Sequence, residues 1–327
     1  MRLGDFIRIG GPFWSIEKSA LEGLLAYDGP PPDRQMPMPR VISGVAIIPV
    51  IGELTPAGQM GGEIGTSTVA TTALVRAAAA SPAVHSILLD INSPGGTVVG
   101  TAGLADAVYR AARDKKVVAL GNSLVASAAY WVASQASEVV GAIDSDWGSL
   151  GVWAMHANQA GALEQAGVEV TIISSAPFKT EGHPWGPLSE AAADYMQSRV
   201  DDQHQDFVAA VARGRKRTPE TVEKTFGKGR IYGAKEAVAR GMIDRIEGPD
   251  TILSKLLPRR GASAAMSLDS KHTRDLLTVA YSACGLVVPD FSQQPARMVA
   301  VQHRDRGHGD PRELRRRLEA KIRRLQC

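Results

Sequence analysis

The chain has 327 residues, of which 44% are hydrophobic and 22% are charged. This composition is typical of a globular protein with a sizeable buried core, and it excludes a wholly disordered chain. Cys284 and Cys327 are its 2 cysteines, and both lie late in the sequence. They allow neither a disulfide framework nor a cysteine zinc site, and they favour a reducing compartment.

Charge is distributed unevenly along the chain. The formal net charge is +3, but residues 259–327 carry 14 Lys and Arg against 7 Asp and Glu, a balance of +7, which leaves −4 for residues 1–258. No apolar run reaches the length of a signal peptide or a membrane span, so we expect a cytoplasmic protein without a membrane span.

Residues 1–35 predict a short N-terminal helical arm. Ser15 can cap an amphipathic helix, and the run of residues 29–32, one glycine and three prolines, ends it. The apolar positions that suggest the helix are Phe13, Trp14, Ile16, Leu21, Leu24 and Leu25. We expect this arm to pack on the body of the protein.

Residues 36–258 alternate between strand and helix patterns. Strands are expected at residues 45–51, 86–91, 117–121 and 138–143, with helices at 68–80, 98–113 and 127–137. Further strands at 171–173 and 242–246 and helices at 189–213 and 234–240 follow. This order predicts an α/β domain in which helical crossovers connect parallel strands.

Residues 259–327 predict a basic, partly helical tail. One helix is expected at residues 276–288, and Asp310 and Pro311 open another whose apolar face is surrounded by arginines. Such a helix fits a partner helix, an acidic protein surface or nucleic acid, or it packs on its own domain.

Two predicted strand-to-helix turns suggest acyl-transfer chemistry. The first contains Gly95 and Gly96, and the second presents Ser127. The Ala128 N–H at the start of a helix and a glycine N–H can stabilise the oxyanion that forms when the serine attacks a carbonyl. Neither glycine cluster has the spacing of a phosphate-binding loop, which argues against nucleotide binding.

Sequence spacing alone does not identify the base that would activate Ser127. His156 can form a triad with Asp144 or Asp146, and His183 is a second candidate. Lys179 is the third, and a lysine amine acts as a base only where its surroundings keep it neutral.

The motifs together resemble the signal peptide peptidase A (protease IV) family of Ser/Lys-dyad serine peptidases. The matching segments are Asn92-Ser93-Pro94-Gly95-Gly96, Ala126-Ser127-Ala128-Ala129-Tyr130, Gly148-Ser149-Leu150-Gly151-Val152, and Lys179 followed by Pro187-Leu188-Ser189. The resemblance spans about residues 40–250. It is closer to the phage-type members that process capsid proteins than to membrane-anchored members. This likeness implies a phage prohead within the host cytoplasm as an alternative location.

The resemblance implies a ClpP/crotonase-like fold built from repeated ββα units and a set of site residues. Ser127 becomes the nucleophile, Lys179 the general base, Gly96 and Ala128 the oxyanion donors, and Gly95 and Ser149 supporting residues. It further implies peptide or protein substrates, with signal-peptide-like segments or phage capsid and scaffold proteins as candidates. It implies a ring-like homo-oligomer, and no metal or organic cofactor.

Three alternatives accompany this interpretation. A ClpP-like Ser-His-Asp peptidase would use His156, and a crotonase-like acyl-CoA enzyme would use the glycine N–H groups without Ser127. A non-catalytic capsid assembly or scaffold component would retain the fold and bind capsid or scaffold proteins through its basic tail.

Overall fold

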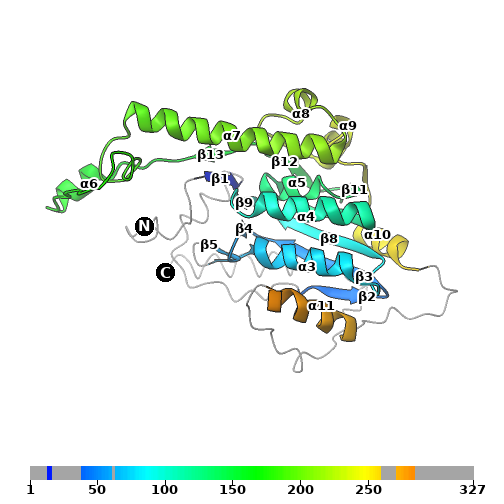
Figure 1. The fold of residues 1–327 in the computed structure, drawn as a ribbon. Helices are drawn as coiled ribbons and strands as arrows, with labels where there is room; N and C mark the ends of the chain where they lie inside the picture. Colours follow the sequence, from blue (N-terminus) through cyan, green and yellow to red (C-terminus); the bar gives the residue numbers. More distant parts are fainter. Residues whose placement is uncertain (1–12, 17–37, 61–62, 259–269, 284–327) are drawn as a thin grey trace, which may run out of the picture. The chain divides into compact units, whose positions relative to one another are not determined.

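The computed structural model describes residues 13–16, 38–60, 63–258 and 270–283, which all belong to one compact unit of residues 1–288 (Figure 1). The predicted helix that begins at Asp310 lies outside the described residues.

The described strands are β1 (Phe13–Ile16), β2 (Arg40–Ile42), β3 (Val45–Ile51), β4 (Leu54–Thr55), β5 (Gln59–Met60), β6 (Glu63–Ile64), β7 (Thr66–Ser67), β8 (Ser86–Ser93), β9 (Gly95–Thr97), β10 (Lys116–Ala126), β11 (Glu138–Gly141), β12 (Asp146–Gly148), β13 (Trp153–Ala154), β14 (Ile231–Gly233) and β15 (Arg245–Ile246). The described helices are α3 (Thr68–Ala80), α4 (Thr101–Asp114), α5 (Ala128–Ala133), α6 (Ala160–Gln165), α7 (Glu190–Arg215), α8 (Pro219–Thr225), α9 (Ala234–Arg240), α10 (Pro249–Leu256) and α11 (Ser270–Ala283).

The larger sheet has the strand order β14-β12-β10-β8-β3-β2, and β11 pairs with both β10 and β15. Strands β3, β8, β10, β11 and β12 pair in parallel along it. The central strands β3, β8 and β10 contain long buried apolar runs, as expected where helices cover both faces of the sheet. The predicted α/β class with parallel strands is therefore confirmed.

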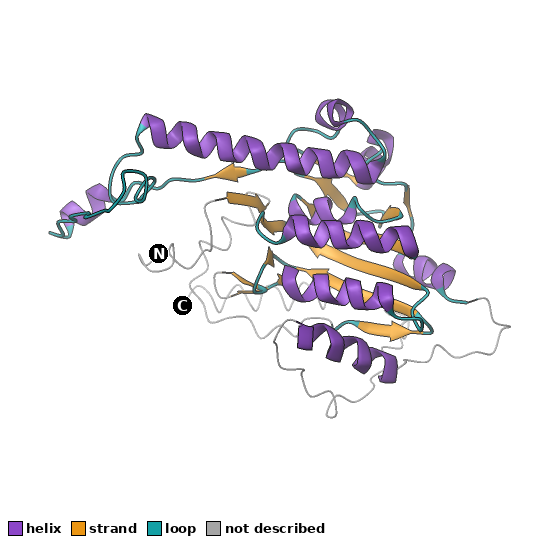
Figure 2. Cartoon of the chain, in the orientation of Figure 1, coloured by secondary structure: helices purple, strands orange, loops and turns teal. Residues whose placement is uncertain are grey.

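Helices lie on both sides of this sheet (Figures 1 and 2). Helices α3 and α4 pack against one another over one face, with α11 beside α3. On the other face, Ile252 and Leu256 of α10 join an apolar cluster with side chains of β3, β8, β10 and β11. Each crossover helix thus buries its apolar stripe on the strands that it connects.

A smaller sheet of short strands has the order β13-β1-β9-β4-β7. Strand β1 lies inside it, antiparallel to β9 on one edge and to β13 on the other. The helix predicted across this part of residues 1–35 is therefore wrong at Phe13–Ile16, which form a strand. Pairing with two neighbours satisfies the backbone of this segment, and this long-range pairing outweighs the helical periodicity of its apolar residues.

Three other expectations differ from the structure. The strand predicted at residues 171–173 is absent, because this segment is exposed and pairs with no other described strand. The helix predicted at 127–137 is shorter, since α5 ends at Ala133. Helix α11 packs on α3 and β2, with Leu277 buried, so it belongs with the domain predicted to end at residue 258 rather than with the tail.

The long helix α7 is anchored through its C-terminal half. Phe207 stacks on Trp131 of α5 with ring centroids 4.6 Å apart. Gly214 lies so close to α5 that a Cβ there would be 2.1 Å from the Ser134 carbonyl oxygen. Only glycine permits this approach of the two helices.

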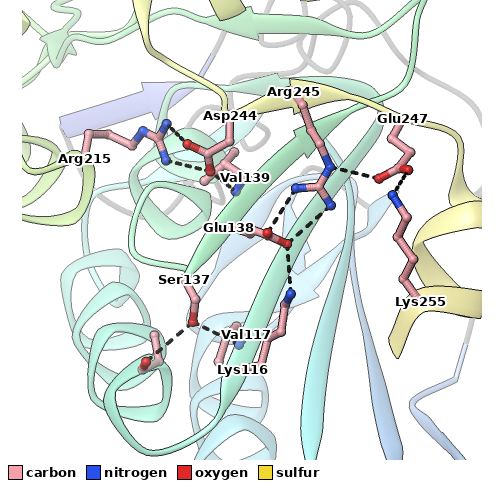
Figure 3. A network of polar contacts seen from close by, with 11 residues as sticks. Lys116, Val117, Ser137, Glu138, Val139, Arg215, Asp244, Arg245, Glu247 and Lys255 are labelled. Carbon is pink, nitrogen blue, oxygen red and sulfur yellow. Dashed lines mark hydrogen bonds and ion pairs between the residues drawn. The ribbon is translucent and has the colours of Figure 1, made fainter. Parts of the chain in front are cut away.

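Ion pairs join the C-terminal end of the domain to β11 (Figure 3). Arg215 donates to Asp244 at 2.6 Å, and Asp244 also accepts the Val139 N–H at 2.7 Å. Arg245 bonds both Glu138 and Glu247. Burial raises the pKa of Asp244, but the hydrogen bonds from Arg215 and Val139 outweigh it and leave that pKa below its ordinary value.

The lowered pKa predicts an acid-sensitive contribution to stability. A carboxylate whose pKa falls on folding stabilises the protein above its unfolded pKa, and this contribution is lost as the pH drops through the folded pKa. We expect Asp244→Asn to lower the free energy of unfolding at pH 7 by about 1–2 kcal/mol, since water screens the partly exposed carboxylate.

Urea unfolding at pH 7, 5 and 3 measures this effect, and the difference from the parent should shrink as the pH falls below about 4. Asp206→Asn, at an exposed position of α7, is the matched control and should leave stability within about 0.5 kcal/mol. A loss that is equal at all three pH values would contradict the role of the charge.

Candidate active site

Ser127 lies at a sharp turn between β10 and α5. Its backbone has φ 54° and ψ −121°, a region that residues with a side chain rarely adopt. The Ser127 N–H donates to the Gly148 carbonyl at 2.7 Å, and the Ser127 carbonyl accepts from Trp131 at 3.0 Å. The turn is thus tied both to the neighbouring strand and to the helix that follows. Strained strand-to-helix turns of this kind are a known way of presenting a nucleophilic serine.

Helix α5 is fixed by burial of all six of its residues. The Tyr130 hydroxyl donates to the Met242 carbonyl at 2.8 Å, and its ring meets Trp147 edge-on. Burial raises the pKa of Tyr130 well above its ordinary value, so the hydroxyl stays protonated and remains a donor. The start of α5, and with it the Ala128 N–H, is therefore held firmly.

The glycine pair lies beside this turn. Strand β8 pairs with β10 so that Ser93 is opposite Val125, two residues before Ser127. The Gly95 N–H donates to the buried Ser93 Oγ at 3.2 Å, and Gly95 has φ 102°. A Cβ on Gly96 would lie 1.9 Å from the Leu54 carbonyl oxygen. Glycine is required at position 95 because of its positive φ, and at position 96 because a side chain would collide with Leu54.

The segment that contains Ser149 forms the opposite side of the site. Gly148 pairs with Ala126 and has φ 135°, where a Cβ would meet the Arg230 carbonyl oxygen at 2.3 Å. Ser149 follows with φ 55°, and its N–H donates to the same carbonyl at 2.8 Å. The positive φ values of Gly148 and Ser149 turn the backbone here so that the Gly148 carbonyl accepts a hydrogen bond from the Ser127 N–H.

A cavity of about 660 Å³ opens along this side. Its lining includes Ile16 of β1, residues 149–153, and side chains of α7 such as Gln197 and Asp201. Ile16 is 2% exposed, so β1 closes one wall of the cavity with an apolar side chain. One wall of the cavity is therefore formed by a strand of the smaller sheet.

Lys179 is not brought to Ser127 in this chain. It lies in residues 155–188, which we call the arm, between β13 and α7. Lys179 is exposed, whereas Ser127 is 1% exposed. The role of Lys179 as a base thus stays a prediction.

The position of the arm follows from α7. The arm leads into Glu190, and the contact of α7 with α5 is at Phe207, about 25 Å further along the helix at 1.5 Å per residue. Figure 1 accordingly shows α6 at the far end of α7 from α5. The arm does not fold back over the serine in the single chain.

His156 and His183 belong to the arm. A ring nitrogen of His156 bonds the His183 carbonyl at 3.0 Å, while Asp144 and Asp146 are exposed on the turn before and at the start of β12. His156 is therefore bonded within the arm, and the structure does not form the alternative triad.

The sequence interpretation missed the contribution of β1. Ser15 pairs with Gly96 and Ile16 with Gly95, so this strand lies directly beside the candidate oxyanion donor Gly96 and its supporting residue Gly95. The only available signal is the apolar spacing of Phe13, Trp14 and Ile16, which also fits a helix.

Neither a metal site nor a membrane-spanning helix is seen in the described ranges. No group of three or more His, Cys, Asp or Glu side chains is placed to hold a metal ion there. None of the helices described is both long and apolar enough to cross a membrane.

Comparisons with known proteins agree with the motifs. Residues 110–262 match the model of peptidase family S49. The chain is 31% identical over 263 residues to capsid assembly protease C of Escherichia phage lambda, covering 78% of this chain and 58% of that protein. It is 30% identical over 215 residues to protease 4 of Salmonella typhi, covering 64% of this chain and 34% of that protein.

The resemblance seen in the sequence is thus confirmed, although the chain spans little more than half of these relatives at most. Among solved structures, a mutant of ClpP1 from Listeria monocytogenes superposes with a TM-score of 0.39 at 15% identity, covering 62% of this chain and 92% of that chain.

The close approach at Gly96 gives a direct test of the site. In Gly96→Ala the new methyl group meets the Leu54 carbonyl oxygen, so β9 must shift, and the Gly96 N–H that we expect to act as an oxyanion donor shifts with it. We expect the rate of labelling by a fluorophosphonate probe to fall by about 10²-fold or more, the usual effect of losing one oxyanion donor.

Gly103→Ala is the matched control, because nothing lies within 4 Å of its Cβ position in α4. This variant should label at the parent rate and gain about 0.5–1 kcal/mol of stability from its helical alanine. Equal labelling of the two variants would exclude Gly96 from the site.

Proposed function

We propose that this chain, of which residues 110–262 match the model of peptidase family S49, is a serine endopeptidase that forms an acyl-enzyme on Ser127. The observation that carries the proposal is the strained backbone of Ser127 at the start of α5, next to the required glycines at 95, 96 and 148. A buried serine held at φ 54° costs about 1–3 kcal/mol of strain, which is a reason to expect a chemical role.

The chemistry follows from the groups around this serine. A neutral Lys179 amine takes the proton from Ser127 Oγ, which attacks the carbonyl carbon of the scissile peptide. The oxyanion accepts hydrogen bonds from the Gly96 and Ala128 N–H groups. The intermediate then expels the amine, which takes the proton from the lysine, and water repeats the same steps to release the acid.

Lys179 reaches Ser127 in an assembly of several copies. The arm exposes apolar side chains with no core of its own: Val168, Val170, Ile173, Phe178 and Trp185 are 40–94% exposed. Such side chains favour burial against another copy, and a homo-oligomer built in this way brings the arm of one copy to the serine of the next. The ring-like oligomer expected from the sequence fits this requirement.

Phage capsid or scaffold proteins are the substrates that the comparisons favour. The similarity to capsid assembly protease C covers 78% of this chain and includes the segments around Ser127 and Lys179. The small buried residues Ala126, Ala128 and Ala129 around the nucleophile favour small or apolar side chains next to the cleaved bond.

Two substitutions test the dyad. Ser127→Ala and Lys179→Ala should each reduce hydrolysis of casein or of a peptide panel by about 10³-fold or more, since each removes a group that the acylation step requires. Lys235→Ala, at an exposed lysine of α9, serves as the control and should hydrolyse at the parent rate. Parent-like hydrolysis by a folded Lys179→Ala variant would remove the lysine from the mechanism.

Mixing the two inactive variants tests the origin of the lysine. In co-assembled Ser127→Ala and Lys179→Ala chains, sites that take the serine from one copy and the lysine from another regain both groups. We expect up to about a quarter of the parent activity in a random one-to-one assembly. An inactive mixture whose co-assembly is shown by pull-down would place both residues within one chain.

A further inference from the structure

We propose that strand β1 is a tethered competitor that occupies the peptide-binding groove of this chain and must leave before a substrate strand enters. The proposal rests on the proposed function, because it concerns the regulation of that same site. Its direct support is the pairing of β1 within the smaller sheet.

The backbone of β1 fills a gap of one strand between β9 and β13. On one edge, Trp14, Ser15 and Ile16 pair with Thr97, Gly96 and Gly95. On the other edge, Phe13 and Trp14 pair with Ala154 and Trp153. Without β1, both β9 and β13 would present free edges that face a common groove, which is the arrangement that binds an extended peptide by strand addition.

The direction of β1 brings its C-terminal end toward the nucleophile. Strand β1 is antiparallel to β9, so its C-terminal residue, Ile16, is opposite Gly95 at the end of β9 nearer Ser93 and Ser127. The chain therefore runs toward the nucleophile as it leaves the groove. A substrate in the same register would place its carbonyl groups beside the Gly96 donor.

Ile16 is the apolar anchor of the strand. Its side chain is 2% exposed and contributes to the lining of the 660 Å³ cavity, and its carbonyl accepts the Trp153 Nε1–H at 3.3 Å. One buried isoleucine and the few hydrogen bonds of a four-residue strand hold β1 in place, and a substrate strand that makes the same contacts can displace it.

Strand β1 can leave without unfolding the larger sheet. Residues 17–39 separate it from β2, and among the described strands β1 pairs with none of the larger sheet. Its departure would remove the strand pairing of β13, from which the arm with Lys179 begins. Occupation of the groove and placement of the arm are therefore linked.

The test uses the full chain with Ser127→Ala as background, so that it measures binding without catalysis. Ser15→Pro removes a backbone N–H and introduces a ring in a strand paired on both edges, which should release β1. Ser15→Ala keeps the backbone unchanged and is the control. The probe is a fluorescent peptide with the sequence of residues 11–18, followed by anisotropy.

We expect the Ser15→Pro chain to bind the probe at least about tenfold more tightly than the Ser15→Ala chain, because no tethered strand competes with it. A probe peptide that itself carries the proline should not bind. Equal affinity of the two folded chains for the probe would overturn the proposal.

A second variant tests the proposal if circular dichroism shows that Ser15→Pro does not fold. Ile16→Asp places a charge in the apolar site and should expel β1, whereas Ile16→Val should retain it. If Ile16→Asp also binds the probe no better than its control, β1 is a permanent strand of the sheet. If the parent chain, which retains Ser127, is not labelled by a fluorophosphonate while the probe still binds, the proposed chemistry is refuted and the proposal for β1 is not.

Discussion

The pairing of strand β10 on both of its edges determines the geometry of the site. Strand β8 pairs on one edge and places Ser93, which holds the glycine turn, opposite Val125. Strand β12 pairs on the other edge and places Gly148 opposite Ala126. The nucleophile follows at once, so three segments that are far apart in sequence meet where β10 ends. A change of register on either edge would separate the serine from one of its neighbours.

The local strain around this point is supported by rigid surroundings. Positive φ values occur at Gly95, Ser127, Gly148 and Ser149, which are unfavourable for the two serines. They persist because α5 is buried on every side, the Tyr130 hydroxyl is bonded to the Met242 carbonyl, and Trp147 packs against the same ring. The stable core around α5 thus maintains a conformation that the turn alone would not keep.

The sequence predicts the core of this fold well, because the signals there are local. It predicts helix α3 at its observed bounds, since Ser67 caps it and Pro82 follows it, and β3 matches its apolar run. The turns at Gly96 and Ser127 are likewise recognisable from their residues. The observed strand at Phe13–Ile16 depends on partners at residues 95–97 and 153–154, and local periodicity contains no information about them.

The missing contact between Lys179 and Ser127 has a different cause. A sequence motif indicates which residues take part in a site. It does not indicate which copy of the chain supplies each residue. The exposed arm is the structural sign of this ambiguity, since side chains such as Ile173 and Phe178 are 94% and 74% exposed. The resemblance proposes Lys179 as the base, and the oligomer proposed above would bring it to the serine of another copy.

The close contact of Gly214 with Ser134 fixes the C-terminal end of α7. The helix is held near its C-terminal end by this contact and by Phe207 on Trp131, and about 25 Å of helix extends from Phe207 to the arm. A rotation of about 10° about Phe207 displaces the start of the arm by about 4 Å, roughly the spacing between two neighbouring strands. Packing in the C-terminal half of α7, far from the arm, therefore sets where the arm lies.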